Sequence, residues 1–239
     1  MISIVVPAYN HHEMTAECLA AVRDNTRDYE IILVDNGSTP AIEGATIRNE
    51  TNLGFPVAVN QGIRAAKGDT IILLNNDVIC TPGSLNRLDT WLHNFSIVAP
   101  CTNYCAGLQQ VMIALYTDRA GLDEQARQWA ADYAGASQEV NWVIGFCMAF
   151  KKSLWDEIGP FDESLWPCSG EELDFCLRAR AAGHRTGIAW DVYVHHIGSQ
   201  TFLDLEKAGT VKYSEICARN ERHVMDRWGV FWNKQELEG

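Results

Sequence analysis

Residues 70–74 (TIILL) constrain the fold more than any other stretch of the chain. No polar side chains alternate with the apolar ones, so both faces of this segment should be covered, as in a central strand of a parallel sheet. Asn75, Asn76 and Asp77 follow at its carboxyl end. Because ligands of open α/β sheets bind outside the carboxyl ends of the strands, Asp77 is a candidate ligand for a metal or a ribose. The alternative is a polar turn that only ends the strand.

Strand and helix patterns alternate over residues 1–100. Further apolar strands are expected at residues 2–7, 30–35 and 97–100. Helices are expected between them, where apolar residues recur at helical spacing in residues 14–25, 55–66 and 85–95. This alternation predicts an α/β fold with Rossmann-like βαβ units and a mostly parallel, doubly wound sheet.

Polar residues follow the expected strands at residues 2–7, 30–35 and 70–74. These three strand ends should converge on one crevice. The first strand runs into Ala8, Tyr9 and Asn10, and the second ends in Asp35 followed by Asn-Gly-Ser. No G-x-G-x-x-G follows the first strand and no G-x-x-x-x-G-K-[ST] is present, so a mononucleotide is a better expectation than a dinucleotide.

Charge and composition narrow the partners. The net charge of -12 argues against a nucleic-acid partner and means that an anionic substrate needs a cation or helix N-termini. No apolar run has the roughly 18 residues of a membrane span and no basic leader precedes the first strand, so a cytoplasmic enzyme is expected. The eight cysteines are scattered through apolar segments, as reduced core thiols are.

An ordered set of motifs covers most of the chain. They are VVPAYN at 5–10, LVDNGST at 33–39, TNLGF at 51–55, LLNNDV at 73–78, GFCMAFKKSLWDEIGPFDE at 145–163, GEELDFCLRARAAGHR at 170–185 and VYVHHIG at 192–198. Together they resemble a family 2 glycosyltransferase of the GT-A fold, in the rhamnosyltransferase-like branch. The resemblance implies one domain over 1–239, with a nucleotide-sugar donor half at 1–100, an acceptor and catalytic half at 101–204 and a C-terminal helix at 205–239.

The implied reaction moves a sugar from a UDP- or dTDP-linked donor to an acceptor hydroxyl. The acceptor would be a glycan or lipid-linked molecule in polysaccharide or cell-surface glycan synthesis, with peripheral membrane contact. A nucleotidyltransferase and a non-catalytic nucleotide-sugar-binding module are the alternatives. The donor-binding residues that the resemblance implies are Pro7, Ala8, Tyr9, Asn10, Asp35, Asn60, Asn75 and Asn76.

Individual donor contacts follow from the same resemblance. Asp35 would accept a hydrogen bond from a pyrimidine, although it could instead cap its own turn. Asp77 matches the last acid of the D-x-D motif and would bind Mn²⁺ or Mg²⁺ on the diphosphate. Asn75 replaces the first acid of that motif, which weakens the expected cation affinity. Asn60 follows Val59 where a basic residue is usual, and it could simply face solvent.

The acids Glu171, Glu172 and Asp174 are the predicted catalytic cluster. Mutual repulsion should raise the pKa of at least one of them, as a general base requires. The resemblance gives the base as Glu172, and a single base without a second nucleophilic acid predicts inversion at the anomeric carbon. The alternative is helix capping, because Ser169 and Glu172 fit an S-x-x-E capping box and Asp174 can pair with Arg178.

His195 is the predicted second metal ligand. Adjacent strand residues point to opposite faces, so at most one of His195 and His196 should enter the site, and the family pattern matches His195. An imidazole ligand favours Mn²⁺ over Mg²⁺. A buried histidine with a structural hydrogen bond is the alternative.

Overall fold

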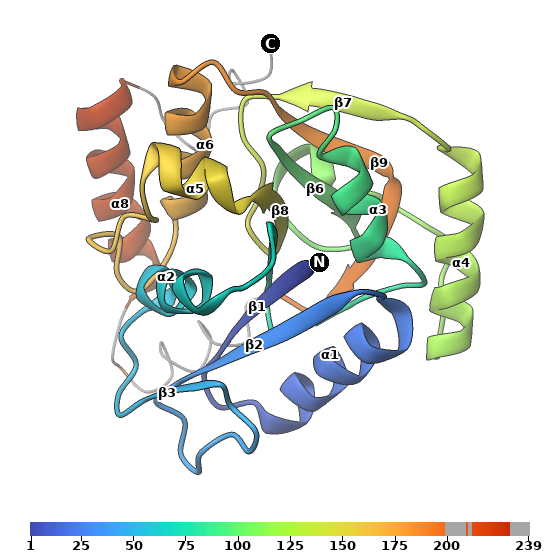
Figure 1. Cartoon of the computed structure of the whole chain (residues 1–239), viewed down its shortest axis with the longest axis horizontal. Helices are drawn as coiled ribbons and strands as arrows, with labels where there is room; N and C mark the ends of the chain where they lie inside the picture. Colours follow the sequence, from blue (N-terminus) through green and yellow to red (C-terminus); the bar gives the residue numbers. More distant parts are fainter. Residues whose placement is uncertain (199–208, 210–211, 230–239) are drawn as a thin grey trace.

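A mixed β-sheet packed with helices forms the centre of the molecule (Figure 1). The computed structural model describes residues 1–198, 209 and 212–229. The strands are β1 (Ile2–Ala8), β2 (Tyr29–Asn36), β3 (Ile47–Asn49), β4 (Thr70–Leu74), β5 (Val78–Ile79), β6 (Ile97–Thr102), β7 (Ser137–Val140), β8 (Cys147–Lys151) and β9 (Thr186–His196). The helices are α1 (His12–Asn25), α2 (Phe55–Ala65), α3 (Ser84–Trp91), α4 (Arg119–Asp132), α5 (Lys152–Ile158), α6 (Glu171–Ala181) and α8 (Tyr213–Trp228), with a short 3-10 turn at η1 (Gly107–Gln109).

The first half of the sheet is parallel, as the βαβ pattern predicts. Strands β3, β2, β1 and β4 lie side by side in that order, and each pair is parallel. Every residue of β1 and β4 is buried, so both faces of these strands are covered. Ala8 pairs with Asp35, which brings the carboxyl ends of β1 and β2 together. The predicted α/β fold class is therefore confirmed.

Strand β8 separates the two halves of the sheet. It runs antiparallel to β4 on one side and to β6 on the other. Beyond it, β9 is parallel to β6 and antiparallel to β5 and β7. The strand that lies beside β4 thus comes from residues 147–151 and not from the next apolar run, residues 97–100.

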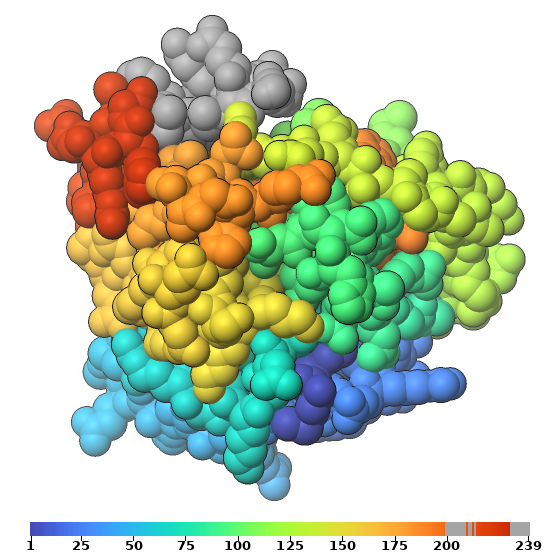
Figure 2. All heavy atoms as spheres, turned by 45° about the horizontal axis from the view of Figure 1, so that its top comes forward, coloured from blue at the N-terminus to red at the C-terminus, as the bar shows by residue number. Residues whose placement is uncertain are grey.

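Helix α2 lies close to the first strands because of a glycine. A Cβ on Gly62 would come within 2.3 Å of Val5 Cγ1, so only glycine allows this approach of helix and sheet. In Figure 2 the blue and cyan N-terminal segments form the lower part of the visible face, the yellow segment that contains α5 lies above them, and α6 (orange) and α8 (red) lie higher still. The predicted domain limits at 204 and 205, and residues 230–239 of the predicted C-terminal segment, lie outside the described residues.

Candidate active site

The tips of β1 and β2 are tied to each other by hydrogen bonds. Asn10 N–H donates to Ser38 Oγ at 2.8 Å, and Thr39 N–H donates to Asn10 Oδ1 at 3.1 Å. Pro7 and Ala8 are still within the β1 ladder and buried, whereas Tyr9 and Asn10 are half-buried at the tip. A ligand at this tip could therefore reach Tyr9 and Asn10 side chains and only the backbone of the preceding strand.

Asp35 makes the turn-capping contacts that were the alternative to base binding. Its carboxylate accepts hydrogen bonds from Ser38 N–H at 2.9 Å and Ile42 N–H at 3.0 Å, and it pairs with the Arg48 guanidinium. Burial opposes ionisation of Asp35, but hydrogen bonds from Ser38 and Ile42 and the Arg48 charge outweigh it and lower the pKa. The side chain is fully buried, so a nucleobase would have to displace existing partners.

Asn60 joins two distant segments instead of facing solvent or a donor. Its amide nitrogen donates to Phe161 O and Glu163 Oε1, both at 2.9 Å, and its amide oxygen accepts from Phe161 N–H at 3.0 Å. The donor role of Asn60 stays a prediction, and it would require the buried amide to release its partners in the segment that follows α5.

The turn after β4 places its three polar side chains in different surroundings. Asn76 is buried, and its Nδ2 donates to Thr15 Oγ1 of α1 at 3.0 Å, so the predicted donor contact would have to replace this hydrogen bond. Asn75 is half-buried, and its Oδ1 has no hydrogen-bond partner among residues 1–198, 209 and 212–229. Asp77 is buried, and its Oδ2 accepts from Gly198 N–H at 3.2 Å.

His196, and not His195, lies beside Asp77. His196 Nε2 is 3.3 Å from Asp77 Oδ1, and the ring stacks on Phe146 with centroids 5.0 Å apart. The other ring nitrogen contacts Tyr104 O at 2.7 Å, which holds the imidazole in place. The structure thus places His196, and not the predicted His195, beside Asp77, and the metal role of either histidine stays a prediction.

His195 belongs to a separate cluster on the other side of β9. Its Nδ1 is hydrogen-bonded to Tyr116 OH, which also lies 3.3 Å from Tyr193 OH. Burial, together with the neighbouring His196, lowers the pKa of His195. Its contacts match the structural alternative considered for this histidine.

A divalent cation fits the residues around Asp77. Asp77 Oδ1 and His196 Nε2 are both buried, and neither has a hydrogen-bond partner within the described part of the chain. Together with Asn75 Oδ1 they supply one carboxylate, one imidazole and one amide oxygen, all of which are metal ligands. No cluster of three or more His, Cys, Asp or Glu side chains that could hold a metal occurs within the described residues. A cation here would need further ligands from a substrate or water.

Glu171 and Glu172 are buried side by side at the start of α6. The Oε2 atom of each has no hydrogen-bond partner in the described ranges. Burial, and then the charge of Glu172, raises the pKa of Glu171 well above its usual range. Burial likewise raises the pKa of Glu172, while backbone groups that include those of Gly170 and Gly145 act against it. Burial, more than the predicted mutual repulsion, is therefore the main cause that raises the two pKa values.

The capping box that was the alternative reading does not form. The residue that caps α6 is Gly170, with φ at 93°, and no side chain caps this end. Ser169 instead has its hydroxyl 3.9 Å from Cys217 Sγ of α8. The acids at this helix start are therefore not explained by a serine cap.

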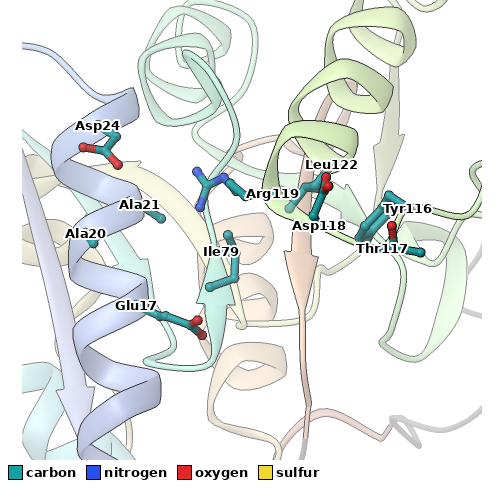
Figure 3. Close-up of a pocket in the computed structure, with 10 residues that line it drawn as sticks. All are labelled: Glu17, Ala20, Ala21, Asp24, Ile79, Tyr116, Thr117, Asp118, Arg119 and Leu122. Carbon is teal, nitrogen blue, oxygen red and sulfur yellow. The ribbon is translucent and has the colours of Figure 1, made fainter.

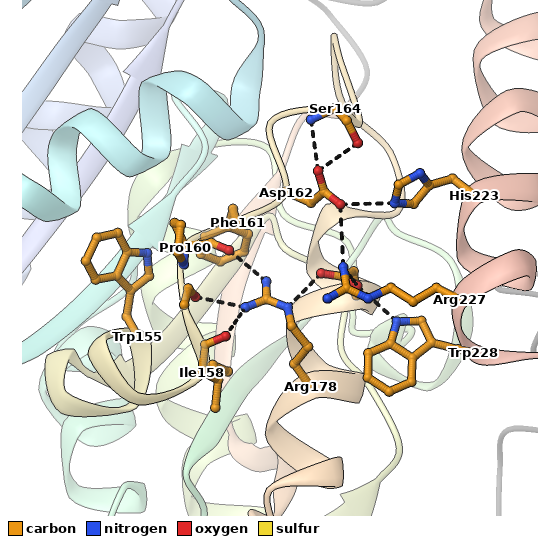
Figure 4. Close-up of polar contacts among 12 residues, drawn as sticks. Trp155, Ile158, Pro160, Phe161, Asp162, Ser164, Arg178, His223, Arg227 and Trp228 are labelled. Carbon is orange, nitrogen blue, oxygen red and sulfur yellow. Dashed lines mark hydrogen bonds and ion pairs between the residues drawn. The ribbon is translucent and has the colours of Figure 1, made fainter.

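Asp174 is buried and bonded to side chains of α6 and α8. Its carboxylate accepts from Arg178 Nε at 2.8 Å and from Trp228 Nε1 at 2.9 Å, and Arg227 lies 3.1 Å away (Figure 4). Arg178 also donates to the carbonyls at the end of α5, which joins α5, α6 and α8 in one network (Figure 4). A catalytic role of Asp174 stays a prediction, and it would require the carboxylate to release partners in this buried network.

The segment Gly145-Phe146 lies between the two glutamates and the pair formed by Asp77 and His196. A Cβ on Gly145 would lie 3.2 Å from Glu172 Cβ, so the backbone here passes directly against that side chain. Phe146 O accepts from Asn75 N–H at 2.9 Å, and the Phe146 ring stacks on His196. The base candidate and the Asp77–His196 pair thus sit on either side of one dipeptide.

A hollow of about 420 Å³ lies elsewhere, between α1 and α4 (Figure 3). Its lining includes Glu17, Asp24, Asp118 and Arg119. None of the predicted site residues lines it, although Tyr116, the partner of His195, does. The acidic lining does not suit a nucleoside diphosphate.

Comparison with known proteins identifies the family. The model of "Glycosyl transferase family 2" matches residues 3–158, which is more than half of the chain. The chain belongs to glycosyl transferase family 2. The match ends at residue 158. Glu171, Glu172 and His196 of this family 2 glycosyltransferase therefore lie outside the matched residues.

Individual relatives are distant from this family 2 glycosyltransferase. It is 24% identical over 225 residues to an uncharacterised protein of Sinorhizobium fredii, covering 82% of this chain but 24% of that protein. It is 27% identical to the uncharacterised glycosyltransferase YwdF of Bacillus subtilis, covering 74% of this chain and 67% of YwdF. The chain thus spans only about a quarter of the Sinorhizobium relative.

A solved structure confirms the GT-A fold. The mannosyltransferase PcManGT from Pyrobaculum calidifontis, in complex with GDP-Man and Mn²⁺, superposes with a TM-score of 0.59 at 18% identity. The match covers 83% of this chain and 57% of that one. The family and fold predicted for this glycosyltransferase are therefore confirmed, while its assignment to the rhamnosyltransferase-like branch stays a prediction.

Proposed function

We propose that this chain transfers a sugar from a nucleoside diphosphate donor to an acceptor hydroxyl, with inversion, and that Glu172 is the general base. The observation that carries the proposal is the buried pair of glutamates with unbonded oxygens, one dipeptide away from Asp77 and His196. Direct displacement by a hydroxyl requires a base within hydrogen-bond reach of the acceptor oxygen, and a buried carboxylate with a raised pKa suits that task.

The two glutamates divide the roles between them. Burial raises the pKa of both, and the charge of Glu172 raises that of Glu171 further. When Glu172 is ionised, its charge therefore keeps Glu171 protonated. Glu172 accepts the proton of the acceptor hydroxyl, and Glu171 limits the negative charge buried beside it. Asp174, bound to Arg178, takes no part in the proton transfer.

Asp77 and His196, with the Asn75 amide, would hold a divalent cation. Bound there, Mn²⁺ or Mg²⁺ would supply Lewis-acid stabilisation to the departing diphosphate. The Gly198 N–H holds Asp77 Oδ2, which leaves Oδ1 directed toward His196. The imidazole ligand favours Mn²⁺, and the Mn²⁺ in the mannosyltransferase structure is consistent with this choice. A chain of net charge -12 also needs such a cation to accept a diphosphate.

The nucleobase of the donor is proposed to be guanine, uracil or thymine, where the sequence alone led us to expect only uracil or thymine. Asp35 was the expected pyrimidine contact, yet its carboxylate is bonded to Ser38, Ile42 and Arg48. The mannosyltransferase of similar fold holds GDP-Man. A donor panel should therefore contain UDP-, dTDP- and GDP-sugars.

The acceptor is proposed to be a glycan or lipid-linked hydroxyl in polysaccharide or cell-surface glycan synthesis. The described helices include none that is long and apolar enough to cross a membrane. Contact with a lipid-linked acceptor would then be peripheral for this part of the chain. Acceptor preference is testable with soluble glycans and with lipid-linked sugars in detergent.

A coupled assay of nucleoside diphosphate release tests the proposal. The protein is incubated with each donor, with an acceptor panel, and with Mn²⁺, Mg²⁺ or EDTA. Release of nucleoside diphosphate that stops in EDTA is the expected result. Pyrophosphate release would indicate a nucleotidyltransferase, and donor binding without release would indicate a binding module. NMR of the product decides the anomeric configuration, and retention would contradict Glu172 as the sole base.

A further inference from the structure

The turn that leads into the two glutamates has an unusual backbone. Ser169 has φ at 86° and Gly170 has φ at 93°, so two consecutive residues before Glu171 are in the left-handed region. A non-glycine residue holds such a conformation only when its surroundings impose it. Whatever fixes Ser169 therefore also fixes the direction in which α6 begins and in which its first side chains point.

Asn220 of α8 makes the contacts that fix this turn. Its Nδ2 donates to Cys168 O at 2.9 Å and to Ser169 O at 2.7 Å. Its Oδ1 accepts from Arg219 Nε at 2.9 Å, so every atom of the amide head is used and the amide orientation is defined. The side chain is 1% exposed. An amide nitrogen held between the two carbonyls just before the catalytic acids is suited to hold that turn in place.

The turn also packs on α8 without any intervening side chain. A Cβ on Gly170 would lie 3.6 Å from Val224 Cγ2 and 3.9 Å from Asn220 Cβ. Elsewhere α8 is anchored independently, through His223 to Asp162 at 3.0 Å and Arg227 to Asp174 at 3.1 Å. Loss of the Asn220 amide should therefore release the turn while α8 stays attached.

We propose that Asn220 is a positioning residue that sets the placement of the Glu171 and Glu172 carboxylates through the carbonyls of Cys168 and Ser169. The catalytic part of this inference rests on the proposed function, because Glu172 is there the base. Asn220 itself touches neither carboxylate in these contacts; it acts through the backbone that carries them.

Asn220→Leu tests the proposal, since leucine keeps the volume and removes the amide. We expect kcat to fall about 10-fold or more, because small misplacement of a catalytic group has large effects on rate, while KM for the donor stays unchanged. Asn220→Ser serves as a second variant if Asn220→Leu does not fold. Trp228→Phe is the matched control, because it removes one α8 hydrogen bond to α6 at Asp174, away from the turn.

A titration gives a readout independent of turnover. The protein is labelled with [δ-¹³C]glutamate, and the two resonances are assigned from Glu171→Gln and Glu172→Gln. In the unaltered protein, the titration midpoints of both carboxylates should lie above the ordinary value of about 4.3. Asn220→Leu should shift these midpoints toward that value, and Trp228→Phe should not. The thiols that interact with the pair, Cys168 and Cys176, have pKa values raised by burial and stay neutral in this range.

The outcomes separate the two claims. Unchanged midpoints and unchanged kcat in a folded Asn220→Leu or Asn220→Ser protein would overturn the positioning role, even if the melting temperature falls as it does in Trp228→Phe. If the unaltered protein releases no nucleoside diphosphate from any donor, the proposed function fails, and the titration alone decides the role of Asn220.

Discussion

The strand tips of β1 and β2 and the region around Asp77 and Glu172 differ in how their buried polar atoms are bonded. At the first tips, Asp35 accepts from Ser38, Ile42 and Arg48, and no oxygen of its carboxylate is without a partner. In the second region, oxygens of Asp77 and Glu172 are buried and unbonded in the described chain. Both regions are rich in acids and amides, yet only the second leaves ligand atoms free.

This difference in the bonding of buried polar atoms helps to distinguish scaffold residues from candidate reacting residues. A buried polar atom without a protein partner costs free energy unless a water, a ligand, a cation or a proton satisfies it. The contacts of Asp35 are those of a scaffold residue that shapes the β2 turn, whereas the proposed function places Asp77, His196, Glu171 and Glu172 in the reacting site. Six substitutions would break or sharpen this division.

The largest effect is expected at Glu172. Glu172→Gln should lower turnover by about 10²-fold or more, because an amide accepts no proton from the acceptor, while donor affinity hardly changes. Steady-state kinetics and calorimetry with donor measure the two quantities. Near-normal turnover in this variant would contradict the general-base role of Glu172.

Glu171→Gln is the companion variant and should be milder in turnover. Because its folded pKa is raised, Glu171 destabilises the folded state progressively as pH rises above the ordinary value of about 4.3. The substitution should therefore raise the melting temperature at pH 8 and leave it unchanged near pH 4. Loss of turnover in Glu171→Gln, with activity kept in Glu172→Gln, would exchange the two roles.

Asp77→Asn should weaken Mn²⁺-supported donor binding by about 10-fold or more, because the one carboxylate among the proposed metal ligands is lost. Titration calorimetry with nucleoside diphosphate, with and without Mn²⁺, measures it. The variant should keep its far-UV circular dichroism. Equal affinities in the two proteins with Mn²⁺ present would exclude the metal role of Asp77.

Asp35→Asn should act on stability rather than on chemistry. Replacing a buried carboxylate that accepts several hydrogen bonds should cost about 1–3 kcal/mol of unfolding free energy, with turnover at saturating donor unchanged. Because the folded pKa of Asp35 is lowered, this stability is fully present above the unfolded value of about 3.9 and is lost as pH falls through the folded pKa. Chemical denaturation at pH 7 and pH 3.5 measures the difference. Abolished donor binding at unchanged stability would restore the base-binding role.

The smallest effect is expected at His195. His195→Phe removes the bond to Tyr116 and should cost about 1 kcal/mol, without changing Mn²⁺-supported donor affinity. His196→Phe is the paired variant and should weaken that affinity, because it removes the imidazole beside Asp77. The reverse result, with His195→Phe the weaker binder, would contradict the placement of the two rings.

Local pattern was enough to predict the fold class and the positions of the acids. The unbroken apolar run before Asn75 marks a strand covered on both faces, and the two glutamates stand at a helix start that the chain itself signals. These features depend on neighbours within a few residues. The strand-end position of Asp77 follows from this local pattern, whereas the base role of Glu172 comes from the family resemblance and stays a prediction.

The side chains whose surroundings differ from the sequence-based expectation have partners that are distant in sequence. Asn60 bonds to Phe161 and Asn76 to Thr15, and neither partner is signalled near the amide. Which of His195 and His196 faces Asp77 depends on how β9 pairs with β5, which alternation alone does not determine. No pattern marked Asn220, because its partners are backbone carbonyls in another segment.

The position of β8 between β4 and β6 has a consequence for biosynthesis. While the ribosome makes residues 75–146, the largely apolar β4 can pair with β1 on one side but has no partner on the other, since its second neighbour is not yet synthesised. An unpaired apolar edge is a site for intermolecular strand pairing, and at translation rates of about 5–20 residues per second it persists for several seconds. The nascent chain therefore passes through an aggregation-sensitive stage that ends only when residues 147–151 emerge and close the sheet.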